Sequence, residues 1–209
     1  MTIRAVAFDL GGVLEDVGPA EQFVARWQQR LGLSEARTAG LRWPLTRADP
    51  GEQAKTGILT QAEYRAHCVS VLGLAGAAAD EFMAEFWDWY CGELDAVLVS
   101  YAAALRPRYR TAILSNSVAG ARGQEQVRFG FEQLVDVIVY SDEVGMAKPD
   151  PRIYSVLCAE LGAEPGEVVF LDNRPPNVDA ACDLGIHGIL HESTRASIAA
   201  IEALITPAG

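Results

Sequence analysis

The sequence predicts an α/β fold: a Rossmann-like parallel sheet with helices on both faces and an inserted α-helical domain. The first observation is a set of short apolar runs that end in polar residues, namely 6–8 before Asp9, 111–114 before Ser115 and 168–171 before Asp172. Continuous apolar runs are typical of strands that are buried on both faces of a parallel sheet. The second observation is that helical patterns separate the later runs, as right-handed crossover connections require.

A mostly helical stretch is expected after the first strand at residues 6–8. Thr60 and Glu63 form a capping box, which predicts the start of one helix. Segment 43–57 contains proline and glycine and is predicted to be a loop with at most a short helix. Apolar side chains at helical spacing mark three helices: Phe23, Val24, Trp27 and Leu31; Tyr64, Cys68, Val71 and Leu72; and Phe82, Met83, Phe86 and Tyr90.

The strand–helix alternation returns near residue 95. Strands are predicted at 111–114, 137–140, 168–171 and 188–190, and helices at 97–105, 152–161, 177–184 and 197–205. We therefore predict two domains. Residues 1–15 and 95–209 form a discontinuous α/β core, and residues 16–94 form a helical domain that sits over the carboxyl ends of the strands and is positioned to act as a lid.

Composition and charge restrict the function classes. The chain has 209 residues and a formal net charge of -11, which argues against nucleic acid as a partner. No apolar run approaches the length of a membrane span, so no membrane partner is expected. The start shows no secretion signal and the four cysteines form no CxxC pair, which favours a cytoplasmic protein. The sequence does not distinguish a monomer from a homodimer.

Polar residues at the strand ends predict a functional site. The carboxyl ends of parallel strands meet at one edge of a sheet, where ligands bind, so Asp9, Ser115 and Asp172 are expected together there. Each residue alone is an ordinary turn residue. Two carboxylates at one place suit a hard cation such as Mg²⁺. Lys148, which precedes Pro149 at the start of a predicted helix, is well placed to neutralise an anion.

Four motifs in this order resemble the haloacid dehalogenase superfamily of hydrolases. The matching segments are residues 6–13 around Asp9, residues 113–117 around Ser115, residues 146–150 around Lys148, and residues 169–173 around Asp172 followed by Asn177. The helical insertion after the first motif is similar to the smaller, C1-type cap of that family. We call residues 16–94 the cap.

The resemblance implies a Mg²⁺-dependent phosphatase that acts on a small phosphorylated metabolite. Asp9 would attack phosphorus and form an aspartyl-phosphate, which water then hydrolyses. Mg²⁺ would bind the carboxylates of Asp9 and Asp172 and the main-chain carbonyl of Gly11. Ser115, Asn116 and Lys148 would bind the phosphoryl oxygens, and Lys148 would also be catalytic by stabilising charge in the transition state.

Two residues depart from the family's phosphatase pattern. Gly11 stands where phosphatases of the family usually have an aspartate that acts as general acid and base, and Asn173 stands where many relatives have another acid. Loss of a general acid typically lowers the rate by about 10²–10⁴. Two alternatives stay open: a 2-haloacid dehalogenase-type hydrolase, which also lacks the second aspartate, and a non-catalytic or weakly active binding protein.

Other polar and aromatic residues are expected to be peripheral to the chemistry. Asp16 and Arg174 are expected at the surface, and the aromatic run 87–90 in the interior of the cap. Trp43 and Arg47 are marginal candidates for recognition of the leaving group. The three histidines are scattered, so structural roles are favoured for His67, His187 and His191.

Overall fold

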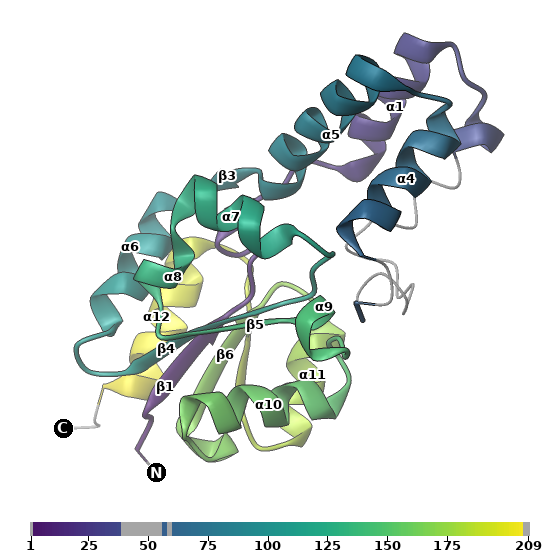
Figure 1. The fold of residues 1–209 in the computed structure, drawn as a ribbon. Coiled ribbons are helices and arrows are strands. Elements are labelled where there is room, and N and C mark those ends of the chain that lie inside the picture. Colours follow the sequence, from purple (N-terminus) through teal and green to yellow (C-terminus); the bar gives the residue numbers. More distant parts are fainter. Residues whose placement is uncertain (1, 39–55, 58–59, 207–209) are drawn as a thin grey trace.

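A five-stranded parallel sheet forms the centre of the molecule in the computed structural model, which describes residues 2–38, 56–57 and 60–206 (Figure 1). Its strand order is β5-β4-β1-β6-β7, and every neighbouring pair is parallel. The fold class predicted from the apolar runs is confirmed. The strands are β1 (Ala5–Phe8), β4 (Arg110–Ser115), β5 (Val137–Tyr140), β6 (Val168–Asp172) and β7 (His187–Leu190).

Helices cover both faces of this sheet. Helices α6 (Ala96–Leu105) and α12 (Thr194–Ile205) pack on one face, and α10 (Pro151–Leu161) and α11 (Pro175–Asp183) on the other. Successive residues of a strand point to opposite faces, so β1 contributes Val6 and Phe8 to one apolar cluster and Ala5 and Ala7 to the other. All four of these β1 side chains are fully buried.

The register of the sheet determines which strand ends meet. Phe8 in β1 is level with Ile113 in β4 and with Leu171 in β6. One residue further along, Asp9 therefore lies beside Asp172. This is the juxtaposition that the polar strand ends predicted.

The cap consists of α1 (Ala20–Leu31), α4 (Gln61–Leu72) and α5 (Gly76–Cys91), and it projects from the carboxyl edge of the sheet (Figure 1). The predicted capping box is present: Thr60 Oγ1 accepts from the Glu63 amide at 3.3 Å, and Glu63 accepts from the Thr60 amide at 2.8 Å. An apolar cluster holds the three helices together and contains all three predicted helical stripes; its largest side chains are Phe23, Trp27, Tyr64, Phe82, Phe86, Trp87 and Tyr90.

A short antiparallel ribbon connects the cap to the core. Strand β2 (Glu15–Asp16) pairs with β3 (Glu93–Leu94); the predicted boundary 15/16 lies within β2, and the predicted boundary 94/95 lies at the end of β3. Strands of two residues leave no periodic pattern, so the sequence did not predict this ribbon. The predicted loop 43–57 lies outside the described residues except for a turn at 56–57.

Several short elements were also missed, and the four helices predicted in the core begin one to three residues earlier than predicted. The missed elements are α7 (Ala121–Phe129), α8 (Phe131–Leu134), α9 (Ser141–Val144) and a 3-10 turn at Pro165–Glu167. Helix α7 buries Glu125 on its inner face, and a charged residue there disrupts the amphipathic pattern. Helix α11 begins at Pro175 instead of residue 177, because proline is well suited to the first helical turn.

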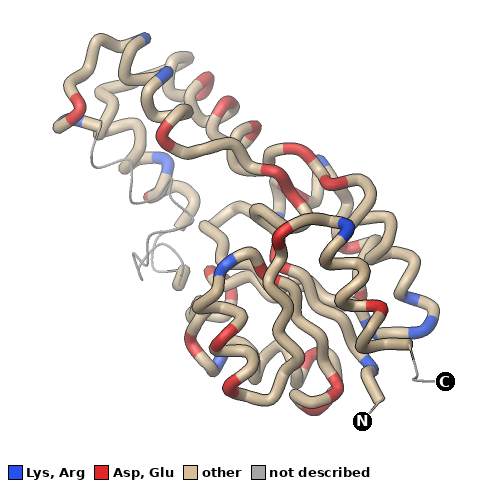
Figure 2. Tube along the Cα trace, turned by 180° about the vertical axis from the view of Figure 1, so that it is seen from behind, with Lys and Arg blue, Asp and Glu red and all other residues tan. Residues whose placement is uncertain are grey.

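Acidic residues are distributed over both the cap and the core, and fewer basic residues are interspersed among them (Figure 2). This distribution accompanies the net charge of -11. Within the described ranges, no helix combines the length and the hydropathy that crossing a membrane requires.

Candidate active site at the carboxyl edge of the sheet

Asp9 is the first residue after β1, and its side chain reaches a cavity at the carboxyl edge of the sheet. The Asp9 amide donates to the carbonyl of Leu171 at 2.9 Å, which continues the ladder between β1 and β6 by one step. The carboxylate is mostly buried, with 10% of the side chain exposed. Because Asp9 also lines the cavity, this exposed part faces a ligand-sized space.

Lys148 lies between the two strand-end carboxylates. Its ammonium nitrogen is 2.7 Å from Asp9 Oδ1 and 2.7 Å from Asp172 Oδ2, and it also donates to the Leu114 carbonyl at 2.8 Å. The side chain is only 1% exposed. An ammonium group has three donors, and these three acceptors use all of them. The structure thus brings together Asp9, Lys148 and Asp172, as the sequence predicted.

Asp172, the last residue of β6, lies beneath the cavity and is fully buried. Its carboxylate also accepts from the Arg174 amide at 2.8 Å and from the Asn177 side chain at 3.1 and 3.0 Å. Asp172 is not among the described residues that line the cavity. Its role as a metal ligand stays a prediction, and binding an ion would require it to exchange one of these contacts.

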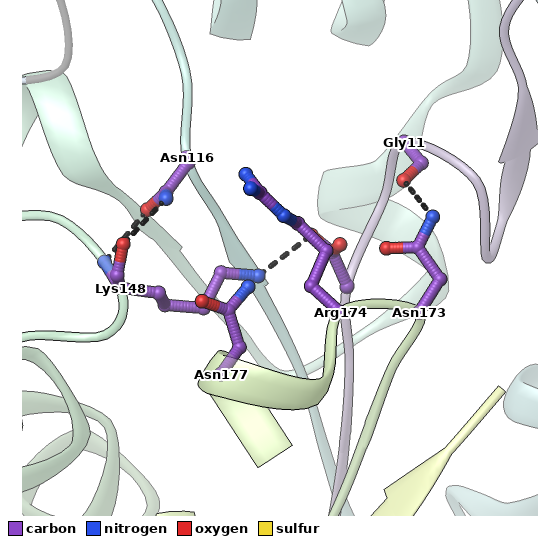
Figure 3. A pocket seen from close by; sticks show the side chains of 7 residues that line it. Gly11, Asn116, Lys148, Asn173, Arg174 and Asn177 are labelled. Atoms are coloured by element: carbon purple, nitrogen blue, oxygen red, sulfur yellow. Dashed lines mark hydrogen bonds and ion pairs between the residues drawn. The ribbon is translucent and has the colours of Figure 1, made fainter. Parts of the chain in front are cut away.

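Asn116 fixes the main chain of Lys148. Asn116 Nδ2 donates to the Lys148 carbonyl at 2.9 Å, and Asn116 Oδ1 accepts from the Lys148 amide at 2.8 Å (Figure 3). This reciprocal pair holds the loop that delivers the ammonium group. Asn116 also lines the cavity, so its predicted contact with phosphate stays a prediction alongside this observed positioning role.

Ser115 ends β4 beside this cluster, but it does not line the cavity. Its side chain is buried, and its hydroxyl has no hydrogen-bond partner among the residues that the structure describes. A buried hydroxyl without a partner is uncommon in a native structure and calls for a reason, such as a ligand. Rotation about the Cα–Cβ bond between staggered positions redirects the hydroxyl without moving the main chain.

The cavity has a volume of about 270 Å³, and its described lining residues are Asp9, Gly11, Asn116, Lys148, Asn173, Arg174 and Asn177. Gly11, Asn173 and Arg174 lie on one side of it, across from Asn116 and Lys148 (Figure 3). Asn173 Nδ2 donates to the Gly11 carbonyl at 3.3 Å, and its amide oxygen is turned toward the interior. The side chain of Arg174, expected at the protein surface, is half-buried and extends into the cavity.

Tyr154 holds the segment after β6 through Asn177. Its hydroxyl donates to the carbonyl of Asn177 at 2.8 Å, and its ring makes an edge contact with Phe170, with 5.7 Å between the ring centroids. Burial raises the pKa of Tyr154, and the negative charges of Asp172 and Asp9 raise it further. The hydroxyl therefore stays protonated and serves as a donor.

The sequence did not predict that Asn177 and Arg174 line the cavity. Asn177 appeared only as part of a motif, and Arg174 was assigned to the surface. A signal for both existed, because the loop after a parallel strand is where ligands bind. Their inward positions depend on how the loop folds onto Asp172, which residue spacing does not specify.

Other candidate residues lie away from the cavity lining. Asp16 is exposed in β2, as expected. His67 lies in α4, while His187 begins β7 and His191 follows it. Burial lowers the pKa of His191, whose ring contacts Ser197 Oγ at 2.9 Å. Trp43 and Arg47 lie outside the described residues.

The family model for haloacid dehalogenase-like hydrolases matches residues 3–185 of this chain. Among curated proteins, mouse bifunctional epoxide hydrolase 2 is 27% identical over 97% of the chain, which spans 39% of that protein's length. N-acetylmuramic acid 6-phosphate phosphatase of Pseudomonas aeruginosa is 24% identical, over 88% of this chain and 80% of the phosphatase.

Solved structures show the same fold. A haloacid dehalogenase family enzyme of Bacteroides thetaiotaomicron, crystallised with magnesium and inorganic phosphate, has a TM-score of 0.74 and 21% identity, over 91% of this chain and 94% of the other. A 2-haloacid dehalogenase of Pseudomonas syringae has a TM-score of 0.64 and 20% identity, over 93% and 91% of the two chains. The family match, the parallel sheet and the strand-end residues agree, and the chain belongs to the haloacid dehalogenase-like hydrolases.

Proposed function

We propose that this protein hydrolyses the phosphate monoester of a small metabolite, with Asp9 as nucleophile. The observation that carries the proposal is the buried cluster in which Lys148 lies 2.7 Å from both Asp9 and Asp172. Of the two carboxylates in the cluster, Asp9 lines the cavity and Asp172 does not. A carboxylate that reaches the cavity beside a fixed cation is suited to nucleophilic catalysis.

The proposed reaction has two steps at phosphorus. An oxygen of the Asp9 carboxylate forms a bond to phosphorus while the bond from phosphorus to the ester oxygen breaks, giving an aspartyl-phosphate and a free alcohol after protonation by solvent. Water then attacks the same phosphorus, which releases inorganic phosphate and restores the carboxylate. The charge of Lys148 reduces the repulsion between the carboxylate and the anionic substrate and stabilises the charge that develops in each step.

Magnesium is part of the proposal, and the donor set is compatible with it. Asp9, the Gly11 carbonyl and the Asn173 amide line one cavity, and oxygen donors are what Mg²⁺ prefers. When bound, the ion would add positive charge next to the transferring phosphoryl group. Asp172 is a further proposed ligand. Because the described residues contain no group of three or more acidic, histidine or cysteine ligands, we expect weak affinity.

The missing general acid narrows the proposed substrates. Gly11 has no side chain to protonate a leaving group, and Asp16 is exposed in the ribbon. A leaving group that departs readily without protonation, such as an aryl oxide or an acyl carboxylate, needs an acid least. We therefore propose activated phosphate esters or acyl phosphates as the preferred chemical class.

Hydrolysis of an aryl phosphate by the purified protein tests this proposal. We expect turnover with Mg²⁺, a large decrease with chelator, and loss of turnover in Asp9→Asn, because the amide is no longer a nucleophile. The matched control is Asp179→Asn, which makes the same change at an exposed position of α11. Turnover that persists in Asp9→Asn would overturn the proposal.

A dehalogenase is the second candidate, favoured by Gly11 because that reaction needs no acid at this position. Asp9 would attack carbon and displace halide, without metal. The carboxylate of Asp172 and its contact with Lys148 favour phosphorus chemistry over this candidate. Halide release from 2-haloacids, insensitive to chelator, would establish the dehalogenase. Absence of both activities would indicate a binding protein on a hydrolase fold.

The proposed partner is a small phosphorylated molecule, because the cavity of about 270 Å³ accommodates a compact ligand. We also propose a reducing compartment such as the cytoplasm. Its support is that Cys68, Cys158 and Cys182 form no disulfide, and that Cys68 and Cys158 are buried.

A further inference from the structure

The phosphoryl group proposed above needs more hydrogen-bond donors than the predicted ligands supply. All three donors of Lys148 are used by Asp9, Asp172 and the Leu114 carbonyl. Asn116 is engaged with the main chain of Lys148, and Asn177 donates to both oxygens of Asp172. A phosphoryl group presents three acceptor oxygens, and the Ser115 hydroxyl with the one remaining Nδ2 hydrogen of Asn116 would leave it poorly bound.

The charge of the site points the same way. Asp9 and Asp172 are two carboxylates against one ammonium group, so the buried cluster carries one excess negative charge. An anionic substrate that enters this cavity meets net repulsion unless another cation is present. Among the described residues that line the cavity, Arg174 is the cation besides Lys148.

The structure holds Arg174 where it can bind an anionic substrate. Its amide donates to Asp172 Oδ1 at 2.8 Å, which ties its main chain to the buried cluster. Pro175 and Pro176 follow it directly and restrict the backbone, while the side chain extends into the cavity between Asn116 and Gly11 (Figure 3). A guanidinium group carries five donors in a planar fork that matches phosphoryl oxygens.

We propose that Arg174 binds the phosphoryl group of the substrate and supplies the positive charge that the Asp9–Lys148–Asp172 cluster lacks. This inference rests on the proposed phosphatase function, which it deepens by assigning a phosphate ligand outside the four motifs. The loop that carries Asn173, where many relatives have an acid, thus presents a guanidinium group at the next residue.

Equilibrium binding of inorganic phosphate tests the inference without any need for turnover. Calorimetry is run on the full chain, once with chelator and once with Mg²⁺. A charge-assisted hydrogen-bond pair is worth about 10- to 100-fold in affinity, so Arg174→Gln is expected to weaken phosphate binding by that factor in both conditions. Arg174→Lys keeps the charge but loses the planar fork of donors. Its phosphate affinity should lie between that of the unmodified protein and that of Arg174→Gln.

Arg4→Gln is the matched control. It removes the same charge from an exposed residue just before β1, at the opposite edge of the sheet from Asp9. We expect phosphate affinity equal to that of the unmodified protein. Circular dichroism on each variant shows whether the fold is retained, and Arg174→Lys provides a second folded variant in which the affinity order can be read.

The outcomes separate this inference from the proposed function. Phosphate affinity that is the same in Arg174→Gln as in the unmodified protein overturns the inference, even if Asp9-dependent hydrolysis is present. An unmodified protein that binds no phosphate also overturns it. Binding that depends on Arg174 in a protein without hydrolytic activity supports the phosphate ligand and rejects the phosphatase.

Discussion

The carboxyl edge of the sheet and the cap place their charged and apolar groups in opposite ways. At the edge, Asp9, Lys148 and Asp172 are buried, and each is held by its neighbours. In the cap, aromatic rings such as Phe86 fill the interior, and ion pairs such as Arg65 with Asp80 lie outside. A buried charge must be fully paired, whereas an exposed pair contributes little to stability.

The difference indicates that the carboxyl edge of the sheet is built for chemistry and the cap for stable packing. A buried charged cluster is expensive to maintain and is weak evidence for stability, so its presence at the carboxyl edge is best explained by chemistry. The cap has the properties of an ordinary small helical core with a solvated surface. Substitutions at the edge should therefore change turnover most, and substitutions in the cap should change stability alone.

Lys148→Met should produce the largest effect. It leaves Asp9 and Asp172 buried without their cation, so we expect turnover to be lost and the free energy of unfolding to fall by about 3–5 kcal/mol. Urea unfolding at neutral pH measures this. A variant as stable as the parent at neutral pH would contradict it.

Gly11→Asp should change the rate in the other direction. Gly11 is not among the glycines with positive φ, so an aspartate can adopt its backbone conformation. A restored general acid should raise the turnover of alkyl phosphates, whose leaving groups need protonation, by about 10²–10⁴. Aryl phosphates should gain less. Steady-state kinetics with matched alkyl and aryl esters measures the ratio, and equal gains for both would argue against an acid role.

Phe86→Ala should reduce the stability of the cap. The Phe86 ring is fully buried, and its centroid lies 5.4 Å from that of Tyr64 and 4.9 Å from that of Trp87. Its removal leaves a cavity and should lower the free energy of unfolding by about 3–5 kcal/mol. Under conditions where the variant is folded, Asp9-dependent turnover should persist. If turnover is lost as completely as in Lys148→Met, the claim that cap substitutions change only stability is contradicted.

Arg65→Gln should have the smallest effect. Arg65 is 2.6 Å from Asp80, and the two side chains are 44% and 73% exposed. An exposed pair of this kind contributes about 0–1 kcal/mol, and salt screens it. Urea unfolding should give nearly the same free energy as the parent protein. A loss comparable to that of Phe86→Ala would show that ion pairs, not aromatic packing, hold the cap together.

The sheet was predictable because burial on both faces leaves an unmistakable continuous apolar run. The strand at 137–140 was predicted to the residue, and the pairing of Asp9 with Asp172 followed from parallel register alone. Helix α7 was not predictable, because its inward-facing Glu125 is satisfied by the hydroxyl of Tyr140, a contact between distant segments. A local pattern of apolar residues indicates which side chains are buried. It does not indicate the partner, here Tyr140, that allows a charged side chain to be buried.

The site was predictable in its strand-end residues and not in its loop. Asp9 and Asp172 occupy positions that topology dictates, whereas Arg174 enters the cavity through a loop whose amide binds the Asp172 carboxylate. The orientation of a loop side chain depends on such contacts. Ser115 shows the converse case: its position was predicted, but its hydroxyl lies just outside the cavity lining.

Direct detection of the phosphorylated enzyme tests the central claim. The protein is mixed with an aryl phosphate and Mg²⁺, quenched in acid during turnover, digested and analysed by mass spectrometry. We predict a phosphoryl group on the carboxylate of Asp9 in the parent protein and none in Asp9→Asn. Phosphate released in steady turnover without any phosphoryl group on Asp9, or with one on another residue, would contradict the account.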